Sequence, residues 1–176
     1  LSRDRLEFTR EHIARSRFSD APLPAGFEED FAMVRAKLDA FIDPPANTWR
    51  RYPPSNNARP ARYARAIAQF RSGRIAEAVV LVDELIAESP RSPWLHELKG
   101  QVLFEGHRPA EALIPYDMAA RLAPDEAMIR LSHARVLIEL GQPDQLHRAL
   151  EELEATLRTE RESPFVWRQV AIAQGR

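Results

Sequence analysis

Apolar positions recur at the spacing of an α-helix near the start of the chain. Large apolar side chains follow one another there at steps of three, four and seven residues, at Phe27, Phe31, Val34, Leu38, Phe41 and Ile42. The pattern predicts one stripe of an amphipathic helix that ends before Pro44. A preceding helix is predicted over about residues 3–17, with Ser2 as its N-cap. We expect the two helices to pair as an N-terminal helical hairpin that packs against another surface.

The segment that follows, from Asp43 to Pro60, is rich in proline and asparagine and carries Trp49 and Tyr52. This composition predicts an irregular connector, and a long loop of this kind often marks a boundary. We therefore expect two parts. The N-terminal hairpin and its connector occupy residues 1–57, and a helical array occupies residues 58–176.

The array repeats itself with a period of about 34 residues, which is typical of stacked helical hairpins. The segment Ala66–Pro90 aligns with Gly100–Pro124, so that Ala78 falls on Ala112 and Val82 falls on Tyr116. Both segments close on a proline after an apolar helix. Helical spacing and the turn residues predict paired helices over residues 61–71 and 75–88, then over 93–105 with a second helix that ends at 122, then over 125–140 with a second helix that ends at about 159. One further helix begins at about residue 163, where Ser163-Pro164-Phe165 echoes Ser92-Pro93-Trp94.

The second copy identifies the kind of repeat. It carries small residues, then an alanine followed by an aromatic residue, then a proline, at Gly100, Ala112, Tyr116, Ala119 and Pro124. This order matches the tetratricopeptide pattern. Such hairpins cannot bury their own apolar faces alone, so copies must stack. The predicted fold is all-α: a tetratricopeptide-type α-solenoid of three hairpins and a truncated fourth, preceded by the N-terminal hairpin.

Two features of the repeats depart from this regularity. The third copy carries about three extra residues in its turn, because Gly141 lies farther from Ala149 than Gly73 lies from Ala78. The fourth copy ends one helix later at Arg176, and the chain starts at Leu1 rather than at a methionine. We therefore expect the sequence to be an excised piece of a longer protein.

Composition and motifs exclude several classes of partner and of catalytic or metal site, but they do not identify a function. The 176 residues carry a net charge of −1, which favours neither nucleic acid nor a membrane surface, and no cysteine is present. No apolar run approaches the length of a membrane span. His96-Glu97 resembles the start of a zinc-protease HExxH helix, but Gly100 stands where the second histidine is required. We find no nucleophile elbow, phosphate loop or catalytic carboxylate pair, so we expect no catalytic residue, metal or cofactor in this chain.

Charge is nevertheless distributed unevenly. Seven arginines and no acidic residue lie between Pro44 and Ala76, with aromatic residues among them. In the next fifty residues, by contrast, acidic residues outnumber basic ones. Basic and aromatic residues together are typical of nucleic-acid binding. In a stacked helical array, arginines more often meet an acidic neighbouring repeat or domain. We favour the second interpretation and expect no nucleic-acid partner.

The first helices of stacked hairpins line a concave groove that binds extended peptides or partner helices. Residues one repeat apart then form rows across this groove. The predicted partner-binding residues are Tyr63, Phe70, Arg71, Trp94, Glu97, Gln101, Phe104, Glu105, Arg135 and Ile138. The row of Phe70, Phe104 and Ile138 fits a groove floor and packing between repeats equally well. The cluster of Lys, Asn and Arg with which some tetratricopeptide co-chaperones bind a terminal carboxylate is not recognisable.

Three segments resemble the C-terminal tetratricopeptide region of bacterial BepA-like HExxH zinc metallopeptidases. They are Leu1–Phe8, Pro60–Arg74 and His96–Gln101. The resemblance implies a periplasmic protease with a chaperone role in outer-membrane protein quality control. It further implies that zinc binds in a catalytic domain absent from this chain, against which the N-terminal hairpin would pack. The order Gly106-His107 departs from that family, which has glycine one place later, and this puts the turn geometry in question.

The resemblance implies that this chain is the arm that docks substrates, or outer-membrane assembly machinery, for the protease. The alternative is a free-standing tetratricopeptide adaptor with no enzymatic domain, in the periplasm or the cytoplasm. The two interpretations differ in what precedes Leu1.

Overall fold

The computed structural model describes residues 2–176, and all regular secondary structure within that range is helical. The helices are α1 (Arg3–Arg15), α2 (Phe27–Ile42), α3 (Pro45–Arg51), α4 (Arg59–Arg71), α5 (Ile75–Glu88), α6 (Pro93–Glu105), α7 (Pro109–Leu122), α8 (Ala127–Leu140), α9 (Pro143–Leu157) and α10 (Pro164–Gln174). None of these described helices is long and apolar enough to cross a membrane.

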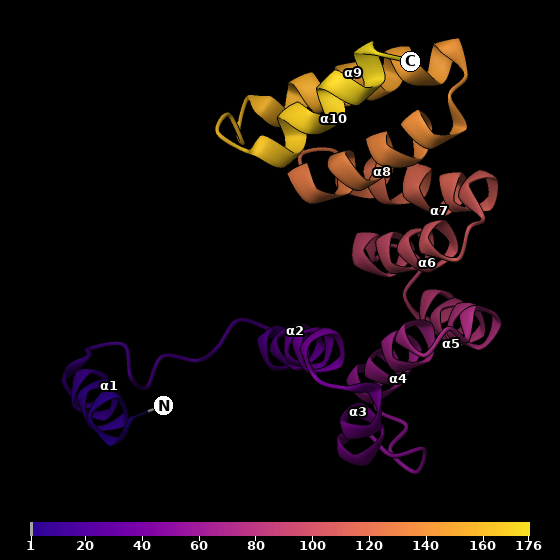
Figure 1. Ribbon diagram of the computed structural model, residues 1–176. Coiled ribbons are helices and arrows are strands. Elements are labelled where there is room, and N and C mark those ends of the chain that lie inside the picture. Colours follow the sequence, from indigo (N-terminus) through magenta and orange to yellow (C-terminus); the bar gives the residue numbers. More distant parts are fainter. Residues whose placement is uncertain (1) are drawn as a thin grey trace.

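The helices from α4 onward form a solenoid of hairpins. Helix α4 packs on α5, α6 on α7 and α8 on α9, and each hairpin packs on the next, as Figure 1 shows. The first helices begin at Arg59, Pro93 and Ala127, so they recur at a constant interval that equals the period of the sequence. Helix α10 packs on α9 and α8, in the place of the first helix of a fourth hairpin. The predicted all-α tetratricopeptide-type solenoid is therefore confirmed.

The turns within the three hairpins share one backbone conformation. Gly73, His107 and Gly141 follow one another at intervals of one repeat, and their φ angles are 75°, 60° and 70°. Glycine adopts this left-handed conformation readily, whereas a residue with a Cβ does so at a cost. The order Gly106-His107 thus leaves the turn geometry unchanged, and His107 takes the conformation that glycine has in the other two turns.

The extra residues of the third repeat lie after the start of α9 rather than in the turn that precedes it. Helix α9 still begins one full repeat after α7, but its buried residues are Ala149, Leu153 and Thr156. Ala149 is the seventh residue of α9, whereas Ala78 is the fourth residue of α5. Helix α10 begins 37 residues after α8, whereas α8 begins 34 residues after α6. The three residues are therefore added between the start of α9 and the start of α10, and the buried face of α9 lies three residues closer to its C-terminus than that of α5. The prediction of a longer turn after Gly141 was wrong, because Pro143 starts the helix at once.

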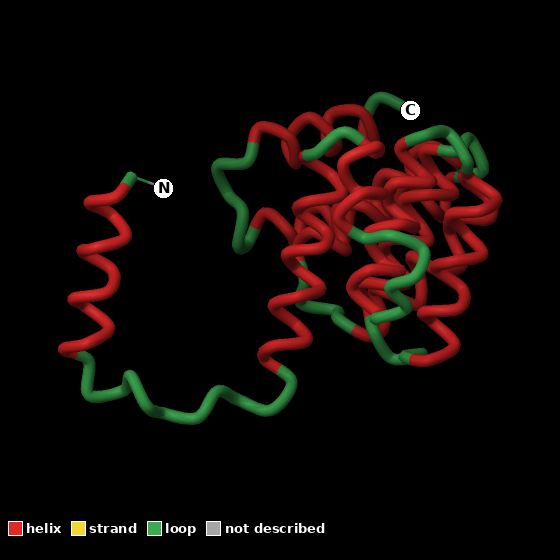
Figure 2. The backbone as a smooth tube through the Cα atoms, turned by 90° about the horizontal axis from the view of Figure 1, so that it is seen from below, coloured by secondary structure: helices red, strands yellow, loops and turns green. Residues whose placement is uncertain are grey.

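The two N-terminal helices do not form the predicted hairpin. Helix α1 has no buried residue, and a long loop separates it from the rest of the molecule in Figure 2. Helix α2 packs on α4 instead and covers the start of the solenoid. It does so through Ala36 and Ala40, which are fully buried, with Met33 and Phe41 beside them.

The apolar stripe predicted on α2 consequently faces away from the core. Its members other than Phe41 are 46–74% exposed, namely Phe27, Phe31, Val34, Leu38 and Ile42. The face that packs is the alanine face, because α4 presents alanines of its own, Ala61 and Ala64, in the same core cluster. Two small-residue faces let the helix axes approach closely, which side chains as large as Phe31 would prevent.

The expected irregular connector contains a short helix, α3. Pro45 occupies its first position, where a missing backbone N–H costs nothing. Tyr52, just after α3, donates its hydroxyl to Asp39 Oδ2 at 2.6 Å, and Arg51 lies 2.6 Å from Oδ1 of the same carboxylate. The Tyr52 hydrogen bond and then Arg51 lower the pKa of Asp39. The division into 1–57 and 58–176 stays a prediction, although Tyr52 and the α2 alanines share one core with α4 and α5.

Each of the seven arginines between Pro44 and Ala76 has a hydrogen-bonding partner within the chain. Arg59 pairs with Glu29 of α2 at 2.6 Å, and Arg62 pairs with Glu88 of α5 through two hydrogen bonds. Arg65 is buried and donates to the backbone carbonyls of three residues in the loop between α3 and α4. The others are Arg50, Arg51, Arg71 and Arg74. Arg51 and Arg59 thus pair with carboxylates of α2 and Arg62 with one of its own hairpin, so within the described residues these arginines meet the preceding helix or their own repeat rather than a neighbouring repeat.

Candidate partner-binding groove

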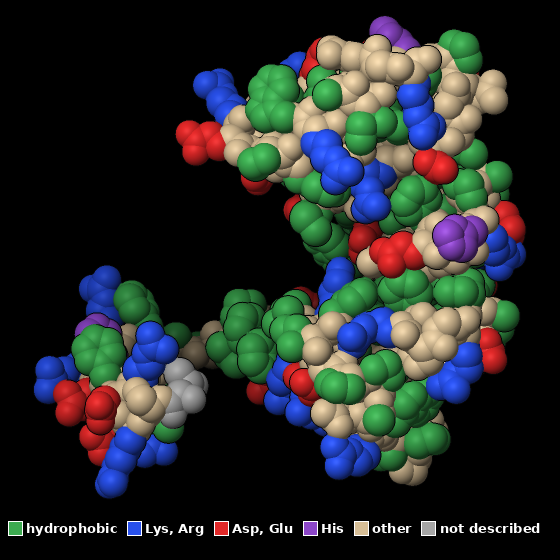
Figure 3. All heavy atoms as spheres, viewed as in Figure 1, with side chains coloured by type: hydrophobic (Ala, Val, Ile, Leu, Met, Phe, Trp, Pro, Cys, Tyr) green, Lys and Arg blue, Asp and Glu red, His purple; other side chains and the backbone are tan. Residues whose placement is uncertain are grey.

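The solenoid is hollowed along one side. Figure 3 shows the hollow between the end that carries α2 and the end that carries α10. The inner side is formed by α2 and by the first helices α6, α8 and α10, while α5 and α7 lie on the outer side (Figure 1). Helix α4 contributes little, because α2 packs over it. Helix α2 thus supplies a wall of the groove that the repeats alone do not predict.

At its N-terminal end the groove deepens into a cavity of about 430 Å³. Residues of α2, α4 and α6 line it: Glu29, Asp30, Met33, Val34, Lys37, Arg59, Tyr63, Ser92 and Trp94. Trp94 is 41% exposed, and the ammonium of Lys37 lies 5.5 Å from the centre of its ring. A cation above an indole face is attracted by the ring quadrupole. The cavity therefore offers one large aromatic surface beside a positive charge.

A buried carboxylate lies beneath this cavity. Glu97 is only 7% exposed, and its Oε2 lies 3.5 Å from Nζ of Lys37. Burial raises the pKa of Tyr63, and the negative charge of Glu97 raises it further. The same two causes, in the same order, raise the pKa of Tyr116. Both phenols consequently keep their protons to higher pH than an exposed tyrosine does, and Lys37 of α2 lies beside the Glu97 carboxylate of α6.

In the C-terminal half of the groove a cation lies between two aromatic rings. The guanidinium carbon of Arg135 on α8 is 5.3 Å from the ring centre of Phe104 on α6 and 5.8 Å from that of Phe165 on α10. Arg135 forms no salt bridge with any carboxylate among residues 2–176. The two rings hold the guanidinium in place, since Arg stacks favourably on aromatic faces. Its donors remain available to an acidic group.

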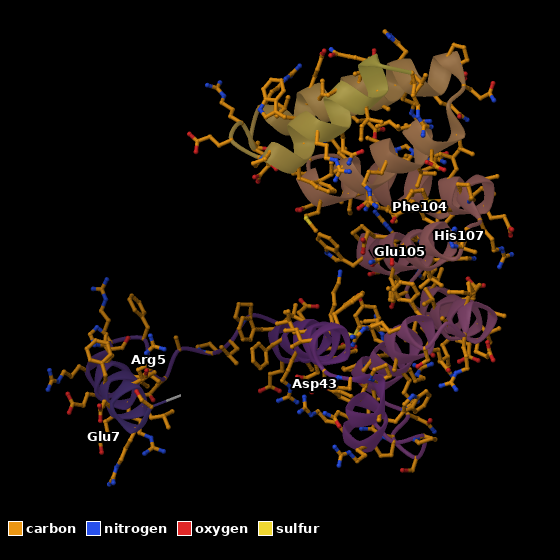
Figure 4. All side chains as sticks on the ribbon, viewed as in Figure 1. Arg5, Glu7, Asp43, Phe104, Glu105 and His107 are labelled. Carbon is orange, nitrogen blue, oxygen red and sulfur yellow. The ribbon has the colours of Figure 1, made fainter. Side chains whose placement is uncertain are left out.

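Beside this cation a shallower hollow of about 420 Å³ opens at the end of α6. Phe104, Glu105 and His107 lie together there, as Figure 4 shows, and Pro109 and Glu139 complete the lining. Gln101 donates to Glu105 across one helical turn at 3.0 Å. This hollow is more acidic than the cavity beside Trp94.

The ten predicted groove residues divide by position. Tyr63, Phe70 and Ile138 are buried between helices, with Phe70 edge-on to Phe41 of α2. For Phe70 and Ile138 the structure therefore shows packing between helices. Arg71 donates to the carbonyls of Ala40 and Asp43 and so caps the C-terminus of α2. Those that face the hollow are Trp94, Gln101, Phe104, Glu105 and Arg135, with Glu97 beneath.

Sequence reasoning missed the contributions of α2 and α10. Lys37 and Val34 enter the groove because α2 packs on α4, a contact that the repeat period does not encode. The place of Phe165 could have been predicted from the sequence, because Ser163-Pro164-Phe165 repeats the order Ser92-Pro93-Trp94 and so puts Phe165 at the position of Trp94. Among the described residues no group of three or more His, Asp or Glu side chains is arranged to hold a metal ion. His96 instead hydrogen-bonds to the Pro90 carbonyl at 2.9 Å.

Comparison with known proteins identifies the fold. No protein-family model matches the chain, and no curated protein matches it. The structure is similar to that of MamA (MamA MSR-1 C2), with a TM-score of 0.64 and 16% identity over 84% of this chain and 83% of MamA. A mutant form of MamA gives 0.63 and 16% over 83% of each chain.

The first tetratricopeptide domain of Spaghetti (RPAP3), solved with the HSP90 peptide SRMEEVD, gives a TM-score of 0.57 and 18% identity. That match covers 62% of this chain and 86% of the RPAP3 domain. At these identities the likeness concerns the fold alone. The chain has the fold of a tetratricopeptide solenoid.

Proposed function

We propose that this chain is a protein-binding module that holds an extended peptide segment along the groove formed by α2, α6, α8 and α10. The observation that carries the proposal is Arg135, held between Phe104 and Phe165 without a carboxylate partner among the described residues. A guanidinium fixed in this way is preorganised for an acidic side chain or a terminal carboxylate, because little entropy is lost on binding.

The second contact of such a peptide is the cavity beside Trp94. Trp94 and Met33 offer apolar surface, and Lys37 borders it with positive charge. Aromatic side chains of this kind often carry much of the energy of an interface. The RPAP3 domain with its bound HSP90 peptide supports peptide binding by a solenoid of this shape. The expected ligand is an extended segment with an acidic residue at Arg135 and a large apolar residue near Trp94.

The test is a selection of peptides on the intact chain, followed by titration of a selected peptide by fluorescence anisotropy. Arg135→Glu is expected to weaken binding at least about tenfold, which corresponds to about 1.4 kcal/mol. Arg121→Glu on the outer helix α7 is the matched control and should leave affinity unchanged. Equal effects of the two substitutions, with helicity intact in both, would mean that the ligand does not use the groove.

At a finer level, we propose that the module is the docking arm of a periplasmic zinc metallopeptidase with a chaperone role in outer-membrane protein quality control. The resemblance of residues 1–8, 60–74 and 96–101 to the BepA-like family supports this, and of these Leu1 lies outside the described residues. The zinc would be bound by the catalytic domain, and the described part of this chain contributes no ligand set. The alternative remains a free-standing adaptor, periplasmic or cytoplasmic, with no nucleic-acid partner in either case.

The reading frame upstream of Leu1 distinguishes the two. A signal peptide followed by an HExxH motif supports the docking arm, whereas a start codon close to Leu1 leaves the adaptor. The groove test above is independent of this result.

A further inference from the structure

Helix α2 is apolar on two opposite faces. Ala36 and Ala40 are fully buried against the solenoid, whereas the large side chains on the other side are 46–74% exposed. We call this second face the α2 stripe; it consists of Phe27, Phe31, Val34, Leu38 and Ile42. Figure 3 shows hydrophobic side chains gathered over α2 at the edge of the hollow. A helix that is apolar on both sides is typical of one that is covered on both sides.

The spacing within the α2 stripe specifies what can cover it. From Phe27 the steps to Phe31, Val34 and Leu38 are four, three and four residues, the alternation of a and d positions in a coiled coil. Phe27 and Phe31 already stack, with ring centres 6.5 Å apart and planes 6° from parallel. The occupant is therefore another helix with the same alternation of apolar residues.

The charges beside the α2 stripe are arranged in self-complementary order. Glu28 and Arg35 flank it on one side, seven residues apart, and Asp30 and Lys37 flank it on the other side, also seven apart. On both sides the acidic residue lies toward the N-terminus and the basic residue toward the C-terminus. An antiparallel copy of the same helix brings acidic ends opposite basic ends on both sides.

We propose that the α2 stripe pairs with the α2 stripe of a second copy of this chain, antiparallel and about a two-fold axis. Phe27 then packs in a layer with Leu38 of the second copy, and Phe31 packs with Val34 of the second copy. Glu28 meets Arg35 of the second copy, so that two-fold symmetry gives two ion pairs on this side. On the other side Asp30 lies toward Lys37 of the second copy, which keeps its pairing with Glu97 of its own chain. A parallel pair would place Asp30 beside Arg35 of the other copy and would leave Glu28 without a basic residue opposite it. Helix dipoles also favour the antiparallel arrangement.

Helix α1 of the same chain is a poorer match for the α2 stripe. Its Leu6 and Ile13 lie seven residues apart on one face, with Thr9 and Arg10 between them, so it supplies an apolar residue only in every second layer. Phe8 lies on another face, beside His12 at 5.0 Å between ring centres. A second copy instead supplies all four layers and the matching charges.

The first test uses the charges and the intact chain in sedimentation-velocity experiments over a range of concentrations. The unsubstituted chain is expected to dimerise reversibly. Glu28→Arg and Arg35→Glu each place like charges opposite each other twice, and each is expected to raise the dimer dissociation constant by about tenfold. An equimolar mixture of the two variants restores opposite charges and is expected to regain the affinity. Circular dichroism verifies that each variant is folded. A chain that is monomeric at the highest attainable concentration, or variants that are not rescued by mixing, would overturn the proposal.

The second test determines orientation and the identity of the occupant. The chain has no cysteine, so single cysteines are unambiguous probes. With a short bismaleimide, a mixture of Phe27→Cys and Leu38→Cys is expected to crosslink efficiently, while Phe27→Cys alone is not. Crosslinking of Phe27→Cys to itself would indicate a parallel pair and overturn the antiparallel geometry. A dimer that forms only after residues 1–15 are removed would mean that α1 covers the stripe in the intact chain. Groove substitutions such as Arg135→Glu leave dimerisation unchanged, which separates this proposal from peptide binding.

Discussion

The ring of Tyr116 on α7 lies directly against the backbone of Gly100 on α6. A Cβ at position 100 would come within 2.6 Å of Cδ2 and 2.7 Å of Cε2 of Tyr116. Real Cβ atoms do not approach other atoms so closely, so any side chain at position 100 must displace the ring. Tyr116 is itself buried, and it packs with Leu103, Ala112 and Val136. The small residue of the repeat pattern therefore has a physical cause, which is the close crossing of the two helices.

We expect Gly100→Ala to lower the free energy of unfolding by about 1–3 kcal/mol, and Gly100→Leu to lower it more, because the second hairpin must open to accept the side chain. Chemical denaturation followed by circular dichroism measures the effect. Combining Gly100→Ala with Tyr116→Leu should cost less than the sum of the two single substitutions, since the smaller residue relieves the contact. An unchanged midpoint for Gly100→Leu would contradict the register of the second repeat.

The turn at His107 offers a stabilising substitution. His107 has a φ of 60°, whereas Gly73 and Gly141, one repeat away on either side, supply glycine for the same conformation. We expect His107→Gly to raise the free energy of unfolding by about 1 kcal/mol, because the left-handed backbone disfavours a Cβ. The matched control is Gly73→Ala, where no atom would contact the new Cβ within 4 Å. It should destabilise by a similar amount through backbone strain alone. A loss of stability in His107→Gly would show that the imidazole makes a contribution larger than the strain.

The repeat architecture could be predicted from the sequence because a small number of local requirements, repeated in each hairpin, determine it. Gly100, Ala112 and Tyr116 mark where helices cross, and glycine at positions 73 and 141 marks where hairpins turn. These local requirements recur in each repeat, so each copy supports the interpretation of the others. The rows across the groove follow from the same period, and Phe104 and Arg135 of those rows lie against each other in the structure, while their role in partner binding stays a prediction.

The position of α2 could not be predicted in this way. Its sequence carries two apolar faces, and the larger residues suggested the wrong one as the core-facing side. The choice depends on the alanines of α4, which accept Ala36 and Ala40 at close range. Helix α2 lies before the first repeat, so a comparison of one repeat with the next cannot show that α2 packs on α4. For the same reason Lys37 was not recognised as the partner of Glu97 and Trp94.

A buried histidine joins the second and third hairpins. His133 on α8 is fully buried, with Nδ1 2.8 Å from Glu152 Oε1 on α9 and Nε2 3.3 Å from Asp117 Oδ1 on α7. Arg148 also reaches Asp117 at 2.6 Å. We expect His133→Leu to lower the free energy of unfolding by about 2 kcal/mol, because it leaves the largely buried Glu152 carboxylate without its hydrogen bond.

The control for this prediction is His147→Leu. His147 is exposed on α9 and lies 3.4 Å from Glu151, one helical turn away. Exposed pairs of this kind contribute about 0.5 kcal/mol or less, so the substitution should be nearly neutral in urea denaturation. Equal losses from the two substitutions would show that the His133 contacts add nothing beyond a surface pair.

The stability of the solenoid should fall steeply at alkaline pH. Burial, and then the charge of Glu97, raise the pKa of Tyr63 and of Tyr116 above the ordinary value of 10.0. In the unfolded chain both phenols lose their protons near pH 10, whereas in the folded chain they keep them to higher pH. The unfolded state therefore binds fewer protons above pH 10, and the free energy of unfolding decreases as pH rises beyond that value.

Each such group contributes a slope of up to about 1.4 kcal/mol per pH unit in this range. We expect Tyr63→Phe and Tyr116→Phe each to flatten the decline in urea denaturation between about pH 9 and pH 11.5, and the double variant to flatten it further. Lys37→Arg serves as the control, because it keeps a positive charge beside Glu97 and leaves both phenols in place. Lys37→Arg is expected to decline as steeply as the unsubstituted chain, and a double variant that also declined as steeply would show that phenol ionisation does not limit alkaline stability.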